Sequence, residues 1–253
     1  MYNAVNVLMY HSISSSPGPT SINPTTFRAQ IDALAARGYE AVPLRNIAAW
    51  HEGSAELPAR AVVITFDDGF ADFAKHAAPI LLAQNWSATV FLPTGRLGGK
   101  EDWYGAEEPA RPLMSWAQVE GLATRGIDFG GHSLTHADLT KLGPADLERE
   151  IRQSSTDIER HLGQAPVGFA PPYGRSNRTV RAAIRKWFRI SVGTRLQRVT
   201  RNCDILDLPR IEMHYFCDLA RWDAYLDGRA EFYFEARRAL RRVRQITLER
   251  RWN

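Results

Sequence analysis

Short apolar runs alternate with amphipathic stretches along most of the chain. The runs are rich in β-branched residues, which is typical of buried strands, whereas the amphipathic stretches repeat apolar residues every three or four positions, as helices do. The predicted strands cover residues 5–9, 61–66, 88–92, 127–129, 167–170 and 190–192. The predicted helices cover about 27–34, 72–84, 115–122, 147–162 and 180–187.

Local signals sharpen two of these helices. Ser115 and Gln118 have the spacing of a capping box, so a helix is expected to start there. Pro79 lies inside the 72–84 stretch and predicts a kink or a break, because proline has no backbone N–H to donate. Residues 95–112 contain several glycines and prolines and are expected to form a long loop.

The strand-then-helix order predicts an α/β fold with a mainly parallel sheet. The repeated crossovers fit either an open doubly wound sheet or a barrel. Both architectures place the functional site at the carboxyl ends of the strands. Residues that directly follow the predicted strands are therefore the candidates for chemistry.

Composition adds a domain estimate. The 253 residues suit one large α/β domain or two small ones, and 44% hydrophobic with 24% charged residues is ordinary for a globular protein. We expect a single catalytic domain over residues 1–253. Nucleic-acid binding is not expected, since the basic residues are mostly terminal and no binding motif accompanies them.

The segment 229–253 is strongly basic and is expected to form a helical extension. It carries much of the formal net charge of +4. One interpretation is a solvated helix face; another is peripheral contact with anionic lipid or a phosphorylated lipid carrier. The basic residues concerned are Arg229, Arg237, Arg238, Arg241, Arg242, Arg244, Arg250 and Arg251.

Cysteine content and the N-terminus bear on location. The chain has only Cys203 and Cys217, so a disulfide framework is not expected and a reducing compartment fits. Residues 1–10 have no basic region followed by a long apolar core, and they resemble a first strand more than a signal peptide. No apolar run approaches the length of a membrane span. We expect a cytoplasmic protein that is at most peripheral to a membrane.

Polar clusters directly follow four predicted strands. Asp67 and Asp68 come after strand 61–66, and two adjacent carboxylates there are costly unless they are paired or bound to a cation. In extended backbone they point apart, so one can bind a metal ion while the other acts as a base. Asp-Asp-Gly is also good turn chemistry, and that alternative stays open. The four clusters are residues 10–12, 65–69, 131–136 and 170–174.

His132 and His136 are spaced i, i+4. On one helical turn two imidazoles at this spacing reach a single metal ion, and with one carboxylate they leave positions open for water and substrate. The alternative is a pair of partly buried, hydrogen-bonded histidines. The predicted neighbouring Asp67–Asp68 pair favours the metal.

These motifs resemble those of the polysaccharide deacetylases, the NodB-homology domain of carbohydrate esterase family four. The resemblance extends from about Val7 to Ile211, and the segment 208–211 resembles one found in exopolysaccharide-type members, which also tend to have alanine at the position of Ala170. It implies a distorted (β/α) barrel of parallel strands with fewer than eight units. The matching segments are 65–69, 132–136 and 171–174, in the family's order and spacing.

The resemblance also implies roles for the matching residues. A divalent ion, most often Zn²⁺, would be held by Asp68, His132 and His136, although the same ligands accept Ni²⁺, Co²⁺ or Mn²⁺. Asp67 would be the general base for an attacking water. The Tyr173 backbone would help to bind the oxyanion, with Pro172 beside it at the substrate.

The chain departs from the family pattern at two places. Ala170 stands where the family often has an arginine that tethers the base; Arg210 could replace it, or could form an ordinary surface ion pair. Met213-His214 only partly matches the family's late Leu-x-His motif. His214 is therefore either a catalytic acid or a satisfied histidine of the core or rim.

Two further residues are candidates for substrate contacts. His11 is expected to line the pocket, where it could bind substrate or hydrogen-bond an aspartate. Trp103 lies in the long loop, and sugar rings stack on such aromatic faces. A packed loop anchor is the alternative for Trp103.

The sequence thus predicts a hydrolase that cleaves a linear amide C–N bond. Its substrate would be N-acetylhexosamine units of a polysaccharide or its precursor, in exopolysaccharide biosynthesis. Within metal hydrolysis, the alternatives are an O-deacetylase or a deformylase on a lipid- or nucleotide-linked sugar. A catalytically silent glycan-binding protein is an alternative of another class.

Overall fold

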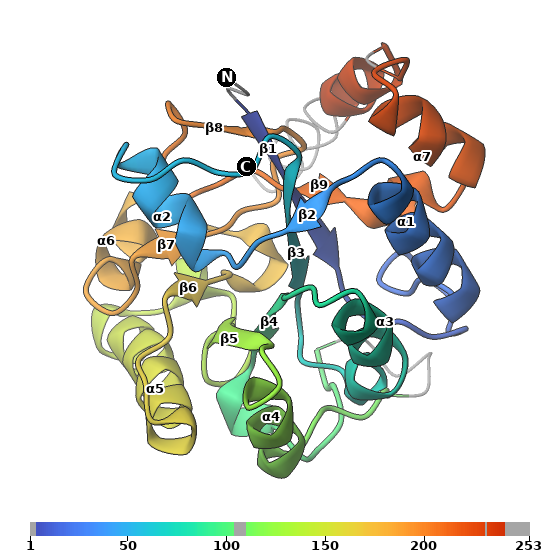
Figure 1. Ribbon diagram of the computed structural model, residues 1–253. Coiled ribbons are helices and arrows are strands. Elements are labelled where there is room, and N and C mark those ends of the chain that lie inside the picture. The colour runs from blue at the N-terminus through green and yellow to red at the C-terminus, as the bar shows by residue number, and fades with distance from the viewer. Residues whose placement is uncertain (1–3, 104–109, 231, 241–253) are drawn as a thin grey trace.

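The computed structural model describes residues 4–103, 110–230 and 232–240 of the chain. Within these ranges the strands form one curled sheet surrounded by helices (Figure 1). The strands are β1 Ala4–Tyr10, β2 Glu40–Ala41, β3 Ala61–Phe66, β4 Thr89–Leu92, β5 Asp128–Gly131, β6 Gly168–Phe169, β7 Ile190–Ser191, β8 Val199–Thr200 and β9 Ile211–Glu212.

The strand order is β7-β6-β5-β4-β3-β1-β8. All pairs are parallel except β1 with β8, which is antiparallel, so the sheet is mixed rather than wholly parallel. Off this path, β2 pairs with β3 and β9 pairs with β1. A single bridge between Val192 and Leu208 joins the end of β7 to the segment that leads into β9. The sheet therefore curls almost into a ring, and the predicted distorted barrel is confirmed.

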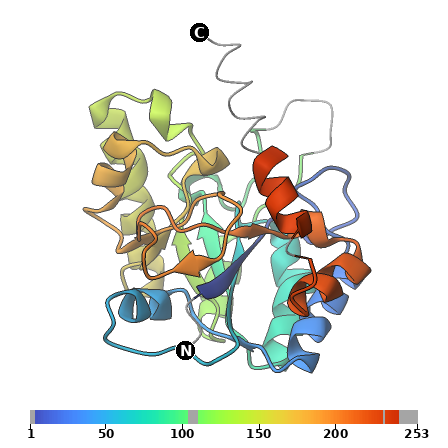
Figure 2. The same cartoon turned by 90° about the horizontal axis from the view of Figure 1, so that it is seen from above.

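Helices cover the outside of the sheet. In Figure 2, α5 and α6 lie on one side of the strands, and α1 and α7 lie on the other. The α-helices are α1 Pro24–Ala36, α2 Arg45–His51, α3 Ala78–Ala83, α4 Trp116–Ala123, α5 Pro144–Leu162, α6 Arg178–Ile184 and α7 Leu219–Leu226. Short 3₁₀ segments occur at Thr94–Arg96 (η2), Leu139–Lys141 (η3), Pro172–Gly174 (η4) and Met213–Phe216 (η5).

The predicted helix signals act as expected. The Ser115–Gln118 capping box is formed at the start of α4. Pro79 marks a break: residues Phe73–Ala77 form a π-helix (η1), and α3 starts at Ala78, with the proline in its first turn, where a missing N–H costs nothing. Gly163 ends α5 in a left-handed conformation.

The central strands are buried on both faces: side chains alternate along a strand, and here each of the two faces packs against an apolar cluster. In β1, Leu8 and Tyr10 pack in the layer shared with α1, α3 and α4. Val5 and Val7 instead pack in a second cluster with Val63 of β3, Phe91 of β4, Val192 just after β7, and residues of α2. Continuous apolar runs were therefore the correct signal for these strands.

Several elements were not predicted. Two-residue strands such as β2 and β8 give no periodic signal, and α2 is only seven residues long. Of the expected 229–253 extension, residues 232–240 are helical, and Phe234 packs against the core beside α7. Residues 241–253 lie outside the described ranges. Within those ranges, no helix combines the length and apolarity needed to cross a membrane.

Candidate metal and active site

A cavity of about 270 Å³ opens at the carboxyl ends of the parallel strands. His11 follows β1, Asp67 follows β3, His132 follows β5, and Glu212 ends β9, so four strands bring side chains to one edge. The lining residues are Met9, His11, Pro19, Thr20, Asp67, Asp68, His132, His136, Tyr173, Gly174, Thr194, Glu212, His214 and Tyr215.

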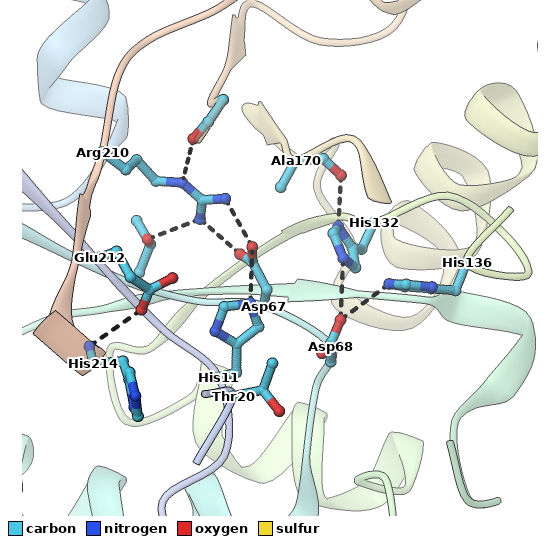
Figure 3. A network of polar contacts seen from close by, with 12 residues as sticks. His11, Thr20, Asp67, Asp68, His132, His136, Ala170, Arg210, Glu212 and His214 are labelled. Atoms are coloured by element: carbon cyan, nitrogen blue, oxygen red, sulfur yellow. Dashed lines mark hydrogen bonds and ion pairs between the residues drawn. The ribbon is translucent and has the colours of Figure 1, made fainter. Parts of the chain in front are cut away.

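Asp68, His132 and His136 form a buried group (Figure 3). Asp68 Oδ1 lies 3.2 Å from Nε2 of each histidine. Two ligand atoms that each lie about 2.0–2.1 Å from one tetrahedral ion are separated by slightly more than the 3.2 Å found here. Among the described residues, Asp68 Oδ2 and His136 Nδ1 have no hydrogen-bond partner although they are buried. The donor set therefore fits a divalent metal ion.

The ring orientation of His132 also suits a cation. The Ala170 carbonyl accepts a hydrogen bond from His132 Nδ1 at 2.6 Å, which leaves Nε2 as the free lone pair. Burial lowers the pKa of both imidazoles. At His132 the hydrogen bond to Asp68 and the charges of both aspartates outweigh burial, so its pKa is raised. At His136 burial, together with the neighbouring His132, outweighs the contact with Asp68, so its pKa is lowered. Despite burial, the two imidazoles hold the pKa of Asp68 far below its ordinary value.

The histidines do not lie on a helical turn, so that expectation is wrong. Ser133 and His136 have φ of 62° and 64°, which is incompatible with a helix. The Ser133 hydroxyl accepts the His136 N–H at 2.9 Å. The buried Glu150 carboxylate on α5 accepts the N–H groups of Leu134 and Thr135 at 3.0 and 2.9 Å. A loop clamped by Glu150 therefore presents His136.

Arg210 is fully buried and pairs with Asp67. Its Nη1 and Nη2 donate to the two carboxylate oxygens of Asp67, each at 2.7 Å. Two further bonds fix the guanidinium, from Nε to the Gly193 carbonyl at 2.9 Å and from Nη1 to Thr65 Oγ1 at 3.1 Å. The alternative of a surface ion pair is excluded. Arg210 thus makes the contact with Asp67 across 143 residues of sequence, whereas the side chain of Ala170 has no group that could form an ion pair.

Adjacent aspartates thus have different partners. Burial alone would raise the pKa of Asp67, but the Arg210 guanidinium, with His132 and His11 nearby, holds that pKa below its ordinary value. Asp68 has φ of 71°, a left-handed conformation that turns its side chain away from that of Asp67. The two carboxylates are therefore ionised side by side, one beside the histidines and one beside the arginine.

Two predicted histidines line the cavity. His11 Nε2 lies 3.9 Å from Asp67 Oδ2, close enough for electrostatic attraction but too far for a hydrogen bond. His214 lies in η5, directly after β9. Its buried Nδ1 has no hydrogen-bond partner among the described residues, so it is not a satisfied core histidine.

Aromatic residues surround His136. Trp103 stacks on its imidazole with ring centroids 4.1 Å apart, so one face of the indole supports a candidate ligand. Tyr173 packs edge-on at 4.8 Å and is 45% exposed at the cavity. Trp103 and Pro172 are not among the lining residues; Pro172 is buried at the start of η4. The expectation that these two residues contact substrate in the cavity is not supported.

Backbone strain is concentrated at this site. Among the described residues, five non-glycine residues have positive φ, and four of them, Asp68, Ser133, His136 and Tyr173, belong to the cavity or its supporting loop. Such conformations persist only where the surroundings impose them, and they gather at functional sites.

The sequence did not predict Glu150, Thr20 or Glu212 as residues of the site. For Glu212, its position just before the partly matching Met213-His214 was the available signal.

This fold and site define a deacetylase of the NodB-homology type. Residues 54–188, more than half of the chain, match the family model of polysaccharide deacetylases, and the chain belongs to that family. The structure of the Streptococcus pyogenes deacetylase PplD in complex with acetate aligns with a TM-score of 0.72 at 25% identity, over 82% of this chain and 91% of that one.

Two curated relatives extend the comparison. The Bacillus subtilis (strain 168) protein named "Putative polysaccharide deacetylase YxkH" is 25% identical over 88% of this chain and 76% of its own length. The Escherichia coli (strain K12) poly-beta-1,6-N-acetyl-D-glucosamine N-deacetylase is 30% identical over 52% of this chain. The latter match spans only 21% of the E. coli protein.

Proposed function

We propose that this protein is a divalent-metal-dependent N-deacetylase acting on N-acetylhexosamine units of a polysaccharide or its precursor. The observation that carries the proposal is the split environment of two adjacent buried carboxylates. Asp68 belongs to a group of metal-ligand type, while Asp67 is ionised and fixed beside it by Arg210. The relative named as a poly-N-acetylglucosamine N-deacetylase supports an amide of an amino sugar as the substrate.

The residues divide the reaction between them. When bound by Asp68, His132 and His136, a divalent ion, with zinc the first choice, supplies Lewis-acid polarisation of the amide carbonyl and a lower pKa for water. Asp67 accepts the proton of the attacking water, and Arg210 keeps it oriented and ionised for that task.

Two groups complete the site. The Tyr173 backbone, strained at φ 60° beside His136, is assigned the stabilisation of the charge that develops on the carbonyl oxygen. His214 lines the cavity and is assigned the donation of a proton to the departing amine. Cleavage of the amide C–N bond then releases acetate and leaves a free amine on the sugar.

The experiment is a combined measurement of metal content and acetate release. Protein purified without chelator is assayed for metal, then given short N-acetylglucosamine oligomers with and without chelator. The proposal requires about one ion per chain and chelator-sensitive release of acetate. Release of formate, or of acetate from O-acetyl sugars alone, would favour the deformylase or O-deacetylase; glycan binding without any turnover would favour a silent binding protein.

A further inference from the structure

Thr20 is a residue of the cavity wall that the proposed reaction does not use. It lies in the loop between β1 and α1, is half-buried, and lines the same cavity as the two aspartates. In the view of Figure 3 it appears on the side of Asp67 and Asp68 opposite Arg210. A cavity of about 270 Å³ is small for a ligand site, so a sugar unit bound in it lies against most of its walls.

The backbone of this loop is fixed by hydrogen bonds. The Ser12 N–H donates to the Thr20 carbonyl at 2.9 Å, and the Ile22 N–H donates to the Ser12 carbonyl at 3.0 Å. Asp72 accepts hydrogen bonds from the Ser12 hydroxyl at 2.5 Å and from the Ile13 N–H at 2.9 Å. The position of Thr20 is therefore set before any ligand enters the cavity.

The side chain of Thr20 is held by Arg111. Arg111 Nη2 donates to Thr20 Oγ1 at 3.1 Å, and Nη1 donates to Ser21 Oγ at 2.9 Å. Another edge of the guanidinium donates to Glu101, from Nε to Oε1 at 2.6 Å and from Nη2 to Oε2 at 2.9 Å. Glu101 is buried, and the guanidinium carbon lies 4.1 Å from the centroid of the Phe70 ring. A two-pronged and stacked contact of this kind fixes the orientation of the guanidinium.

The contact with Arg111 also determines which role the Thr20 hydroxyl has left to play. A guanidinium can only donate hydrogen bonds, so the Thr20 oxygen must be the acceptor. The hydroxyl still has one proton of its own, and none of the described residues accepts it. Because a hydrogen bond received from a charged group polarises the hydroxyl, that proton is also a better donor than it would otherwise be.

We infer that Thr20 binds the substrate by donating this proton in a hydrogen bond to an oxygen atom of the sugar, and that Arg111 positions it. The inference rests on the proposed function and adds a binding residue to it. A hydroxyl that is already oriented loses little freedom on binding, which favours affinity. Since the contact is made with the sugar rather than with the reacting amide, it acts on KM and leaves kcat unchanged.

The test compares Thr20→Val, which keeps the shape of the side chain but removes the hydroxyl, with its parent. Both are made in the zinc-loaded Asp67→Asn chain, so that N-acetylglucosamine trimer binds without being consumed. Ser21→Ala is the matched control, because it removes the other hydroxyl that Arg111 contacts although Ser21 does not line the cavity. Calorimetry gives the dissociation constants, and KM and kcat are measured in chains that keep Asp67.

Thr20→Val is expected to weaken binding of the trimer about fivefold, the contribution of one hydrogen bond, and to raise KM by the same factor with kcat unchanged. Ser21→Ala should bind the trimer as the parent does. Unchanged binding in Thr20→Val would overturn the inference, and so would an equal loss in Ser21→Ala, which would assign the effect to packing of the loop.

The same measurements separate the inference from the proposed function. Binding that depends on Thr20, without acetate release by the chain that keeps Asp67, would leave the inference standing and refute only the deacetylase activity. Acetate release with a KM that Thr20→Val does not change would do the reverse. No binding of the trimer by the parent and no acetate release would overturn both.

A double-mutant cycle with Arg111→Lys tests the role of the arginine. Lysine keeps a positive charge beside the buried Glu101, but its single ammonium group cannot reproduce the fork that reaches Thr20. Arg111→Lys should weaken trimer binding where Thr20 is present and have little further effect in Thr20→Val. The same fold-loss in both backgrounds would show that Arg111 does not act through Thr20. Thermal melting of each variant verifies that it is folded.

Discussion

Asp67 and Arg210 form the pair on which the proposed chemistry depends most directly. Replacing Asp67 with asparagine keeps the shape of the side chain but removes the base. We expect turnover to fall by about 10²–10⁴-fold, the usual contribution of a general base. Acetate release at saturating substrate measures this, and metal content should stay near one ion per chain because Asp68 is untouched. Wild-type turnover in Asp67→Asn would remove Asp67 from the mechanism.

In the proposed mechanism, Arg210 sets the pH range in which Asp67 can act as a base. With the arginine present, the pKa of Asp67 lies below its ordinary value, so the carboxylate stays ionised as the pH falls. In Arg210→Lys the single ammonium group cannot form both hydrogen bonds to Asp67, so the pKa of Asp67 should rise. As the pH is lowered, the variant should therefore lose activity at a higher pH than wild type does. The acid limb of the kcat/KM profile should therefore move upward.

The same pair contributes to stability with a definite sign. Because the folded pKa of Asp67 is depressed, its contribution is present above the unfolded-state pKa and disappears as the pH falls toward the folded value. Removing the arginine altogether would leave a buried carboxylate without a counter-charge, at a cost of about 3–5 kcal/mol of folding stability, which is why lysine is the better variant.

An unchanged acid limb of the kcat/KM profile in folded Arg210→Lys would show that Arg210 does not tune the pKa of Asp67.

At the scale of elements, the loop at residues 132–136 depends on α5. Glu150→Gln replaces charge-assisted bonds to two backbone N–H groups with weaker ones, so His136 should be held less firmly. We expect metal affinity to fall about 10–100-fold, as for other residues that orient metal ligands. Competition with a chromophoric chelator measures it. Glu159→Gln, on an exposed position of the same helix, is the control and should bind metal as wild type does.

Elements with long apolar periodicity were predictable, and those stabilised mainly by tertiary contacts were not. The strand at residues 61–66 and the capping box at Ser115 follow from local sequence. The conformation of residues 132–136 does not, because a serine hydroxyl and a distant glutamate impose positive φ there. The motif identified the histidines as partners correctly but suggested the wrong backbone between them.

The candidate site was predicted to a similar extent. Asp67, Asp68, His132 and His136 were found because they lie in short motifs after strands. The contact of Arg210 with Asp67 spans 143 residues, so sequence could only offer it as one of two alternatives. Pro172 and Trp103 were expected at the substrate, but neither lines the cavity: Trp103 stacks on His136 and Pro172 is buried in η4, and sequence does not show which way a side chain faces.

For the whole molecule, metal binding should raise the free energy of unfolding and hence the Tm. The metal-ligand group joins loops after β3 and β5, so an ion binds the folded chain in preference to the unfolded one. An ion at about 100 times its Kd would add roughly 2.7 kcal/mol. At about 2–4 °C per kcal/mol for a chain of this size, Tm should fall by several degrees on chelation.

The control for that measurement is Asp68→Asn, which should melt at the same temperature with or without chelator. A wild-type Tm that ignores both zinc and chelator would contradict a metal site in this group. Zinc is the ion to add first, followed by cobalt, nickel and manganese, since the same ligands accept each of them.

The near-closure of the barrel between β7 and β9 has a consequence during translation. A nascent chain that has emerged as far as residue 188 already holds both aspartates and both histidines, but Arg210 and the Val192–Leu208 bridge are still to come. Until that last quarter has been made and folded into place, Asp67 lacks the Arg210 guanidinium, its main counter-charge. The Arg210–Asp67 pair can therefore form only after the last quarter of the chain has been synthesised.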